Sequence, residues 1–222
     1  MKEETPDYIG HRQRLKERFK LGGGQDMADY EMLELLLTLA IPRKDTKPLA
    51  KALVKEFGGF AEVLFAPDDR LMTFKDLKES SVLVFKIVRE SALRMSWQKL
   101  SATEAPVLTS FDSIMEYCRA ASGYKEREEF RVIFLNAKNR IIGEEVQQRG
   151  SVNAVAIHPG EVMRAAVLKG ATALILVHNH PSGDVTPSRA DIEVTRKIEG
   201  ALSAVDIRLI DHFIVSKNLV YS

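Results

Sequence analysis

The feature that most restricts the fold is an unbroken apolar run, Ala173–Val177. A run of strand length with no polar alternation is typical of a β-strand that is buried on both faces. A strand of this kind lies inside a sheet, and other elements cover each side of that sheet. The run therefore predicts a central strand in a sheet with flanking helices.

Strands and helices are expected to alternate around this run, over residues 101–222. Residues 130–146 contain two β-runs joined by a polar turn at Asn136–Asn139, which is the pattern of a hairpin. A hairpin joins antiparallel strands, whereas a helix between two strands favours parallel pairing, so the sheet is expected to be mixed. The remaining expected elements are helices over 111–121, 159–169 and 188–202 and closing strands over 207–216 and 219–222.

Residues 1–100 show a different pattern, because their apolar residues recur at spacings of three and four. Leu33, Leu36 and Leu37 illustrate it, and Asp29 is expected as the N-cap of their helix. Glycines at 22–24 and 58–59 are placed to end helices. We therefore predict an α+β chain with two domains, a helical bundle over 1–100 and an α/β domain over 101–222.

Composition excludes several classes of protein. The 222 residues include 32 Lys+Arg and 31 Asp+Glu, a formal net charge of +1, so any binding to nucleic acid must come from a local patch. Cys118 is the only cysteine, which excludes an internal disulfide and a metal site built from thiolates. The first 15 residues lack the apolar core of a signal peptide, and no run approaches the roughly 18 apolar residues of a membrane helix. A cytoplasmic protein without a membrane partner is expected.

The segment that follows the apolar run carries the chemistry. His178 and His180 are two residues apart at a strand end, so their side chains leave the same face. Pro181 and later turn residues lead the chain into the next expected helix, which places Asp191 on its first turn. Two imidazoles and a carboxylate are good zinc ligands, and three protein ligands leave one position for water, as in catalytic sites. The spacing predicts one zinc ion per chain, although such a triad also suits ferrous iron.

Each part of this pattern also has a purely structural interpretation. Ser188 and Asp191 have the spacing of a helix capping box, and this role is compatible with a role at the metal. A single His-x-His pair often occurs without any metal. The literal string His178–Asn179–His180 is unrelated to HNH nucleases, whose named residues are dispersed through a ββα element. The combination of strand end, His-x-His-Pro, turn, Ser and Asp in this order is much rarer than its parts.

His178, His180, Pro181, Ser188 and Asp191 together match the JAMM metalloprotease motif. The surrounding sequence resembles the bacterial RadC family over residues 128–216. The segments that carry this resemblance include LNAKNRIIGEEV, GSVNAVAIHPGEVMRAAV and ALILVHNHPSGDVTPSRADI. The resemblance implies a cytidine-deaminase-like α/β fold, a catalytic zinc and peptidase-type chemistry.

The same resemblance implies roles for two further side chains. In JAMM proteins the general base is a glutamate that precedes the first strand of the domain. The matching residue in this sequence is Glu128, with Glu129 as the alternative. The Ser188 hydroxyl is implied to stabilise the oxyanion of the tetrahedral intermediate.

The helical half resembles the helix-hairpin-helix modules that contact the DNA backbone through a glycine hairpin. Residues 74–81, at the matching place, contain no glycine, so the module is degenerate and only a weak contact with DNA is expected.

Three functions remain open on this basis. The first is a zinc-dependent hydrolase of JAMM type that cleaves a peptide or isopeptide amide in an unknown substrate. The second is a DNA-associated accessory protein, in a repair or recombination context, whose metal site is structural or vestigial. The third is a metal-dependent nuclease that uses the same three ligands.

Overall fold

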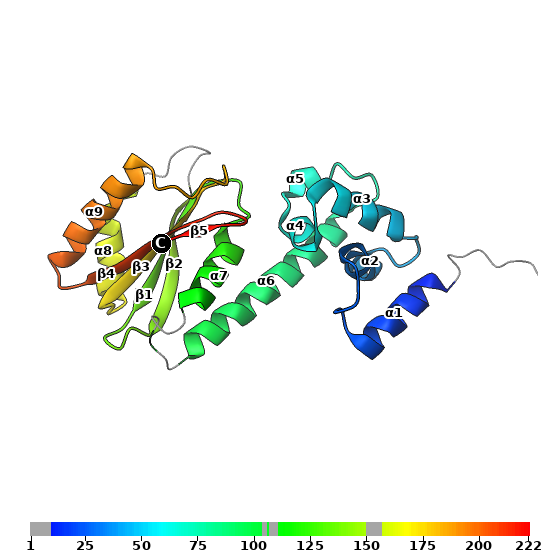
Figure 1. Cartoon of the computed structure of the whole chain (residues 1–222), viewed down its shortest axis with the longest axis horizontal. Helices are drawn as coiled ribbons and strands as arrows, with labels where there is room; N and C mark the ends of the chain where they lie inside the picture. Colours follow the sequence, from blue (N-terminus) through cyan, green and yellow to red (C-terminus); the bar gives the residue numbers. More distant parts are fainter. Residues whose placement is uncertain (1–9, 104–105, 107–110, 150–156) are drawn as a thin grey trace, which may run out of the picture. The chain divides into compact units, whose positions relative to one another are not determined.

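The computed structural model describes residues 10–103, 106, 111–149 and 157–222. The chain divides into two compact units, Met1–Ser91 and Ala92–Ser222, and the division falls within α6 (Glu79–Ala102) (Figure 1). The expected domain boundary at residue 100 stays a prediction.

The first unit is helical in its described part. Its buried core contains Leu33 and Leu37, which are fully inaccessible to solvent and belong to the expected apolar face. Helix α6 contributes Phe85 to the same core. The other helices are α1 (His11–Gly22), α2 (Asp29–Ala40), α3 (Lys47–Phe57), α4 (Phe60–Phe65) and α5 (Asp68–Leu71).

The expected N-cap role of Asp29 is wrong for its own helix. Helix α2 begins at Asp29, and Ala28 occupies the N-cap position. The Asp29 carboxylate instead accepts a hydrogen bond of 2.9 Å from the backbone N–H of Phe60, the first residue of α4. Asp29 therefore caps the start of a different helix, because the tertiary fold brings that unpaired donor to it.

The second unit contains a five-stranded mixed sheet with the order β2-β1-β3-β4-β5. Strand β3 pairs antiparallel with β1 and parallel with β4, which confirms the expected mixed sheet and central strand. A turn at Asn136–Asn139 joins β1 to β2, as expected for a hairpin. The strands are β1 (Glu129–Leu135), β2 (Ile141–Arg149), β3 (Ala173–Asn179), β4 (Arg208–Val215) and β5 (Val220–Tyr221).

Every residue of β3 is buried, because helices cover both faces of the sheet (Figure 1). Ala173, Ile175 and Val177 pack toward α7 (Phe111–Ser122), together with Cys118, which is fully buried. The alternate residues, including Leu174 and Leu176, pack against α8 (Pro159–Leu168) and α9 (Arg189–Ser203). The face that α8 and α9 cover is the one that carries the site.

In the part of the chain that the structure describes, no helix combines the length and the apolar character needed to cross a membrane.

Candidate metal centre

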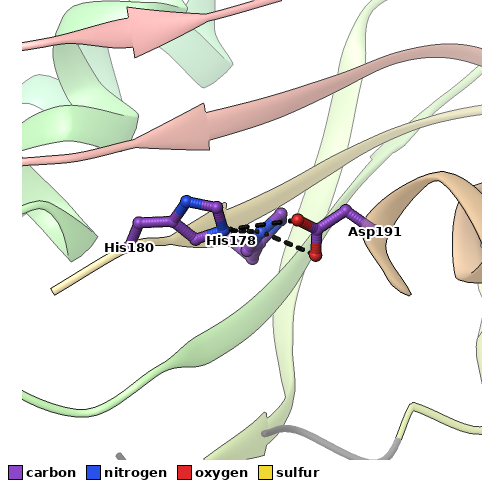
Figure 2. Close-up of side chains that lie close together, drawn as sticks. All are labelled: His178, His180 and Asp191. Carbon is purple, nitrogen blue, oxygen red and sulfur yellow. Dashed lines mark hydrogen bonds and ion pairs between the residues drawn. The ribbon is translucent and has the colours of Figure 1, made fainter. Parts of the chain in front are cut away.

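His178, His180 and Asp191 converge on one point (Figure 2). The Nε2 atoms of the two histidines are 2.9 Å apart. The Asp191 carboxylate lies 3.2 Å from Nε2 of His178 and 3.4 Å from Nε2 of His180. One ligand atom from each residue lies within 4.8 Å of the others, so all three can contact one ion.

Local sequence explains why these side chains meet. His178 belongs to β3 and lies two residues after Leu176, so it points toward the same face as Leu174 and Leu176, which α9 covers. The chain then turns through residues 180–187, and α9 begins with Ser188 as its N-cap. The Ser188 hydroxyl accepts a hydrogen bond from the N–H of Asp191, and the Asp191 carboxylate accepts one of 2.7 Å from the N–H of Ser188. The capping box thus holds the Asp191 carboxylate beside the histidines.

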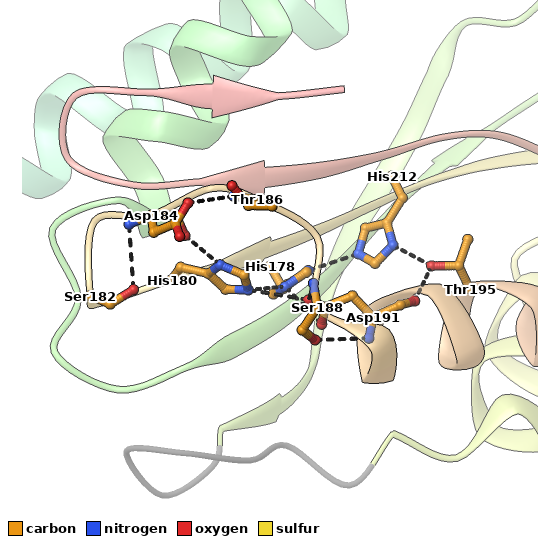
Figure 3. Close-up of polar contacts among 9 residues, drawn as sticks. All are labelled: His178, His180, Ser182, Asp184, Thr186, Ser188, Asp191, Thr195 and His212. Atoms are coloured by element: carbon orange, nitrogen blue, oxygen red, sulfur yellow. Dashed lines mark hydrogen bonds and ion pairs between the residues drawn. The ribbon is translucent and has the colours of Figure 1, made fainter.

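A backbone carbonyl determines the protonation of the His180 ring. His180 Nδ1 lies 2.6 Å from the carbonyl oxygen of Asp184 (Figure 3). A carbonyl only accepts, so Nδ1 must carry the proton and donate it. The Nε2 atom of a neutral His180 therefore presents a lone pair toward Asp191.

A chain of hydrogen bonds determines the His178 ring in the same way (Figure 3). The Thr195 hydroxyl donates its only proton to the Asp191 carbonyl at 2.5 Å. Its oxygen must then accept from His212 Nδ1, which lies 2.6 Å away, so His212 Nε2 is an acceptor. His178 Nδ1 lies 2.8 Å from that acceptor and donates to it. His178 is thereby left with its lone pair on Nε2, which faces the cluster.

These assignments bear directly on metal binding. Two imidazole lone pairs and one carboxylate face one another, and the imidazole protons are all used in bonds that point outward. Such a group of electron-pair donors repels itself and is stabilised by a cation between its members. The residues present therefore fit a metal ion with nitrogen and oxygen ligands.

Burial and neighbouring groups support the required charge states. Burial would raise the pKa of the Asp191 carboxyl, but hydrogen bonds to the carboxylate, including the one from Ser188, outweigh it and hold that pKa well below its usual range. Burial lowers the pKa of His212 to about 3. The carboxyl is therefore ionised and His212 neutral near pH 7, as the hydrogen-bond chain requires.

The cluster opens into a cleft of about 600 Å³. Glu128, just before β1, reaches this cleft and is partly exposed. The lining residues are Glu128, Phe130, Ile157, His178, His180, Pro181, Ser182, Ser188, Ala190, Asp191, Glu193, Val194 and Lys197.

The two candidate glutamates lie on different faces of the sheet. Phe130 pairs with His178 in the β1–β3 ladder, and continuing that register by two residues brings Glu128 opposite His180. Glu129 is 2% exposed and is held on the other face by ion pairs with Lys125 and Arg131. Glu128 lines the cleft that contains the three candidate ligands, and Glu129 is not among the lining residues that the structure describes.

His212 lies on the predicted closing strand over 207–216, and nothing in the sequence indicates its contact with His178 or the contact of Thr195 with His212. The signal for both residues is weak in the sequence, because His212 lies on β4 and reaches His178 only through the parallel β3–β4 pairing. Asp184, on the loop between the candidate ligands, contributes its backbone carbonyl to the contact with His180, and its carboxylate accepts a hydrogen bond from the backbone N–H of Thr186.

Comparison with known proteins identifies the family of the chain. Residues 108–222 match the RadC-like JAB domain. A UPF0758 protein from Ruegeria pomeroyi is 44% identical over 218 residues, which are 98% of this chain and 96% of the relative. The match thus extends through the helical half as well as the sheet. The chain belongs to the RadC family and carries a JAB/MPN-type domain.

Proposed function

We propose that this protein is a zinc-dependent hydrolase that cleaves a peptide or isopeptide amide. The observation that carries the proposal is the convergence of His178, His180 and Asp191 on a cleft that Glu128 also lines. A cluster of metal-binding groups with an adjacent carboxylate is the arrangement that activates water in metallopeptidases.

The side chains divide the chemistry between them. Zinc held by the two histidines and Asp191 would supply Lewis acidity and lower the pKa of a water molecule. Glu128 accepts the proton of that water and returns it to the leaving amine. The Ser188 oxygen is already used as the acceptor for Asp191 N–H, so its own proton remains to donate to the developing oxyanion.

The charge of the cleft favours an amide over a phosphodiester substrate. Among the lining residues that the structure describes, Glu128, Asp191 and Glu193 are acidic, whereas Lys197 is the only lysine or arginine. Nucleic-acid sites usually carry an excess of Lys and Arg, because phosphates dominate the affinity. The cleft also has apolar walls from Phe130, Ile157 and Val194, which suit a peptide.

A substrate panel tests the proposal. Zinc-loaded protein is incubated with peptide, isopeptide-linked and single- and double-stranded DNA substrates. We expect one zinc ion per chain by elemental analysis and amide cleavage that a chelator abolishes and added zinc restores. Absence of stoichiometric metal after metal-replete purification, or cleavage of DNA without amides, would overturn it. Salt-dependent DNA binding without any hydrolysis would support the accessory role instead.

A substitution at Ser188 separates its capping role from its proposed role in catalysis. Ser188→Ala should cost roughly 0.5–2 kcal/mol of stability, which Ser188→Asp should largely restore because Asp is also a good N-cap. Ser188→Asp should nevertheless remain inactive, since a carboxylate adds negative charge where the oxyanion develops, and loss of one donor costs ~10²-fold in kcat. Melting temperature, zinc content and turnover of this variant are the measurements. An active Ser188→Asp enzyme would show that the serine is only a cap.

A further inference from the structure

We propose that Asn179, the residue between the two histidines, is a positioning residue that holds Glu128 against the metal-binding cluster. The inference rests on the proposed function, because it assigns Glu128 its place in that reaction. Asn179 is fully buried, and its position on β3 directs its side chain to the face opposite His178. The Asn179 side chain therefore does not reach the cluster of His178, His180 and Asp191, and its carboxamide binds elsewhere.

All the hydrogen bonds of the Asn179 carboxamide go to the segment around Glu128. Its Oδ1 accepts a bond of 2.8 Å from the backbone N–H of Glu129. Its Nδ2 donates to the carbonyl of Arg127 at 3.1 Å and to the carbonyl of Lys125 at 3.2 Å. Both amide protons and the carbonyl oxygen are thus used, and every bond is made to backbone atoms.

These three hydrogen bonds, which form the Asn179 bracket, hold the backbone on both sides of Glu128. One bond holds the residue before Glu128 and another holds the residue after it, while the Glu128 side chain stays free to face the cleft. The backbone ladder between β1 and β3 does not do this, because that pairing begins at Phe130 and His178, and the β1–β2 ladder reaches Glu129 but not the residues before it. The Asn179 side chain in effect extends the ladder beyond the end of the strands.

The bracket links the proton acceptor to the metal ligands through a single residue. Asn179 is covalently attached to both His178 and His180, so the backbone that carries the imidazoles also carries the anchor for Glu128. A displacement of about 1 Å in a reacting group can cost 10²-fold in rate. Loss of the bracket should therefore lower turnover while leaving the three metal ligands in place.

The variant Asn179→Asp tests this positioning role without a change in the size of the side chain. A carboxylate retains the acceptor for Glu129 but loses both donors, so the carbonyls of Lys125 and Arg127 would face a negative charge. We expect kcat to fall ~10²-fold with zinc affinity, measured by chelator competition, nearly unchanged. In the Glu128→Gln background the same change should add no further loss, because it acts through Glu128.

A matched control is available at the β1–β2 turn. Asn136 uses its Oδ1 as an acceptor for the N–H groups of Lys138 and Arg140, so Asn136→Asp retains both bonds and should leave kcat unchanged. Asn179→Ala provides a second, uncharged variant in case burial of the Asp charge unfolds the protein. A full additive loss in the Glu128→Gln background would mean that Asn179 does not act through Glu128.

Hydrogen exchange in the wild-type protein gives a readout that needs no hydrolysis. The side-chain amide protons of Asn179 and the backbone amide of Glu129 should exchange slowly by NMR, and Asn179→Ala should release the Glu129 amide. Fast exchange of these protons in the wild type would overturn the proposal. If the exchange pattern holds but no amide is hydrolysed, the bracket stands and the proposed hydrolase function fails.

Discussion

Zinc-loaded Glu128→Gln protein is expected to hydrolyse amides 10²–10⁴-fold more slowly than wild type while retaining its metal. The carboxamide keeps the shape of the side chain but cannot accept a proton from water at neutral pH. Glu128 is not one of the three clustered ligands, so zinc content should be the same in both proteins. Steady-state kinetics and elemental analysis on the same preparations measure the two effects separately.

The neighbouring glutamate is the matched control for this substitution. Glu129→Gln removes a buried charge that pairs with Lys125 and Arg131 on the other face of the sheet. It should lower the free energy of unfolding by ~1–3 kcal/mol, measured by denaturant titration, and leave most of the turnover intact. If Glu129→Gln is the inactive variant and Glu128→Gln retains activity, the assignment of the general base is wrong by one residue.

The second large effect is expected at the metal ligands. His178→Ala should purify without stoichiometric zinc and without activity, because a two-ligand site built from His180 and Asp191 binds far more weakly. The same substitution leaves Nε2 of His212 without its hydrogen-bond donor, so a modest loss of stability is also expected. Elemental analysis after dialysis against a zinc-buffered solution gives the stoichiometry.

His158 provides the control for the loss of an imidazole. It is exposed, lies just before α8 and is outside the cluster, so His158→Ala should bind zinc as tightly as wild type. Retention of one tightly bound zinc ion in His178→Ala would refute the assignment of the ligands. Loss of zinc in both variants would indicate binding at the surface rather than in the cluster.

That His178, His180 and Asp191 come together could be predicted from the sequence, because the determinants of this cluster are local. His178 and His180 follow a buried strand, and Asp191 starts the next helix, so strand alternation and helix capping are sufficient to bring them together. The order of elements over the second unit could be predicted for the same reason. The runs between Phe130 and Val215 have clear strand or helix periods and clear turn residues.

The contacts that could not be predicted from the sequence depend on pairing between strands that are distant in the chain. His212 contacts His178 only because β4 lies parallel to β3, and Asn179 meets the Glu128 segment only because β3 pairs with β1. Asp29 has the residue type of an N-cap but caps α4 rather than α2, since the fold brings the N–H of Phe60 to its carboxylate. The N-cap propensity of Asp predicted in that case that the side chain caps a helix, but it did not predict which helix.

The location of the ligands along the chain has a consequence for how the protein folds. Residues 178–191 contain all three candidate ligands in one strand–loop–helix segment, and contacts between groups so close in sequence form early at small entropic cost. The segment of Glu128 is tied to β3 by a bond between residues 50 positions apart, so its placement depends on a contact between distant parts of the chain. Under the proposed function, a folding chain would therefore assemble its metal-binding residues before Glu128 is in place and would become competent for catalysis only when β1 pairs with β3.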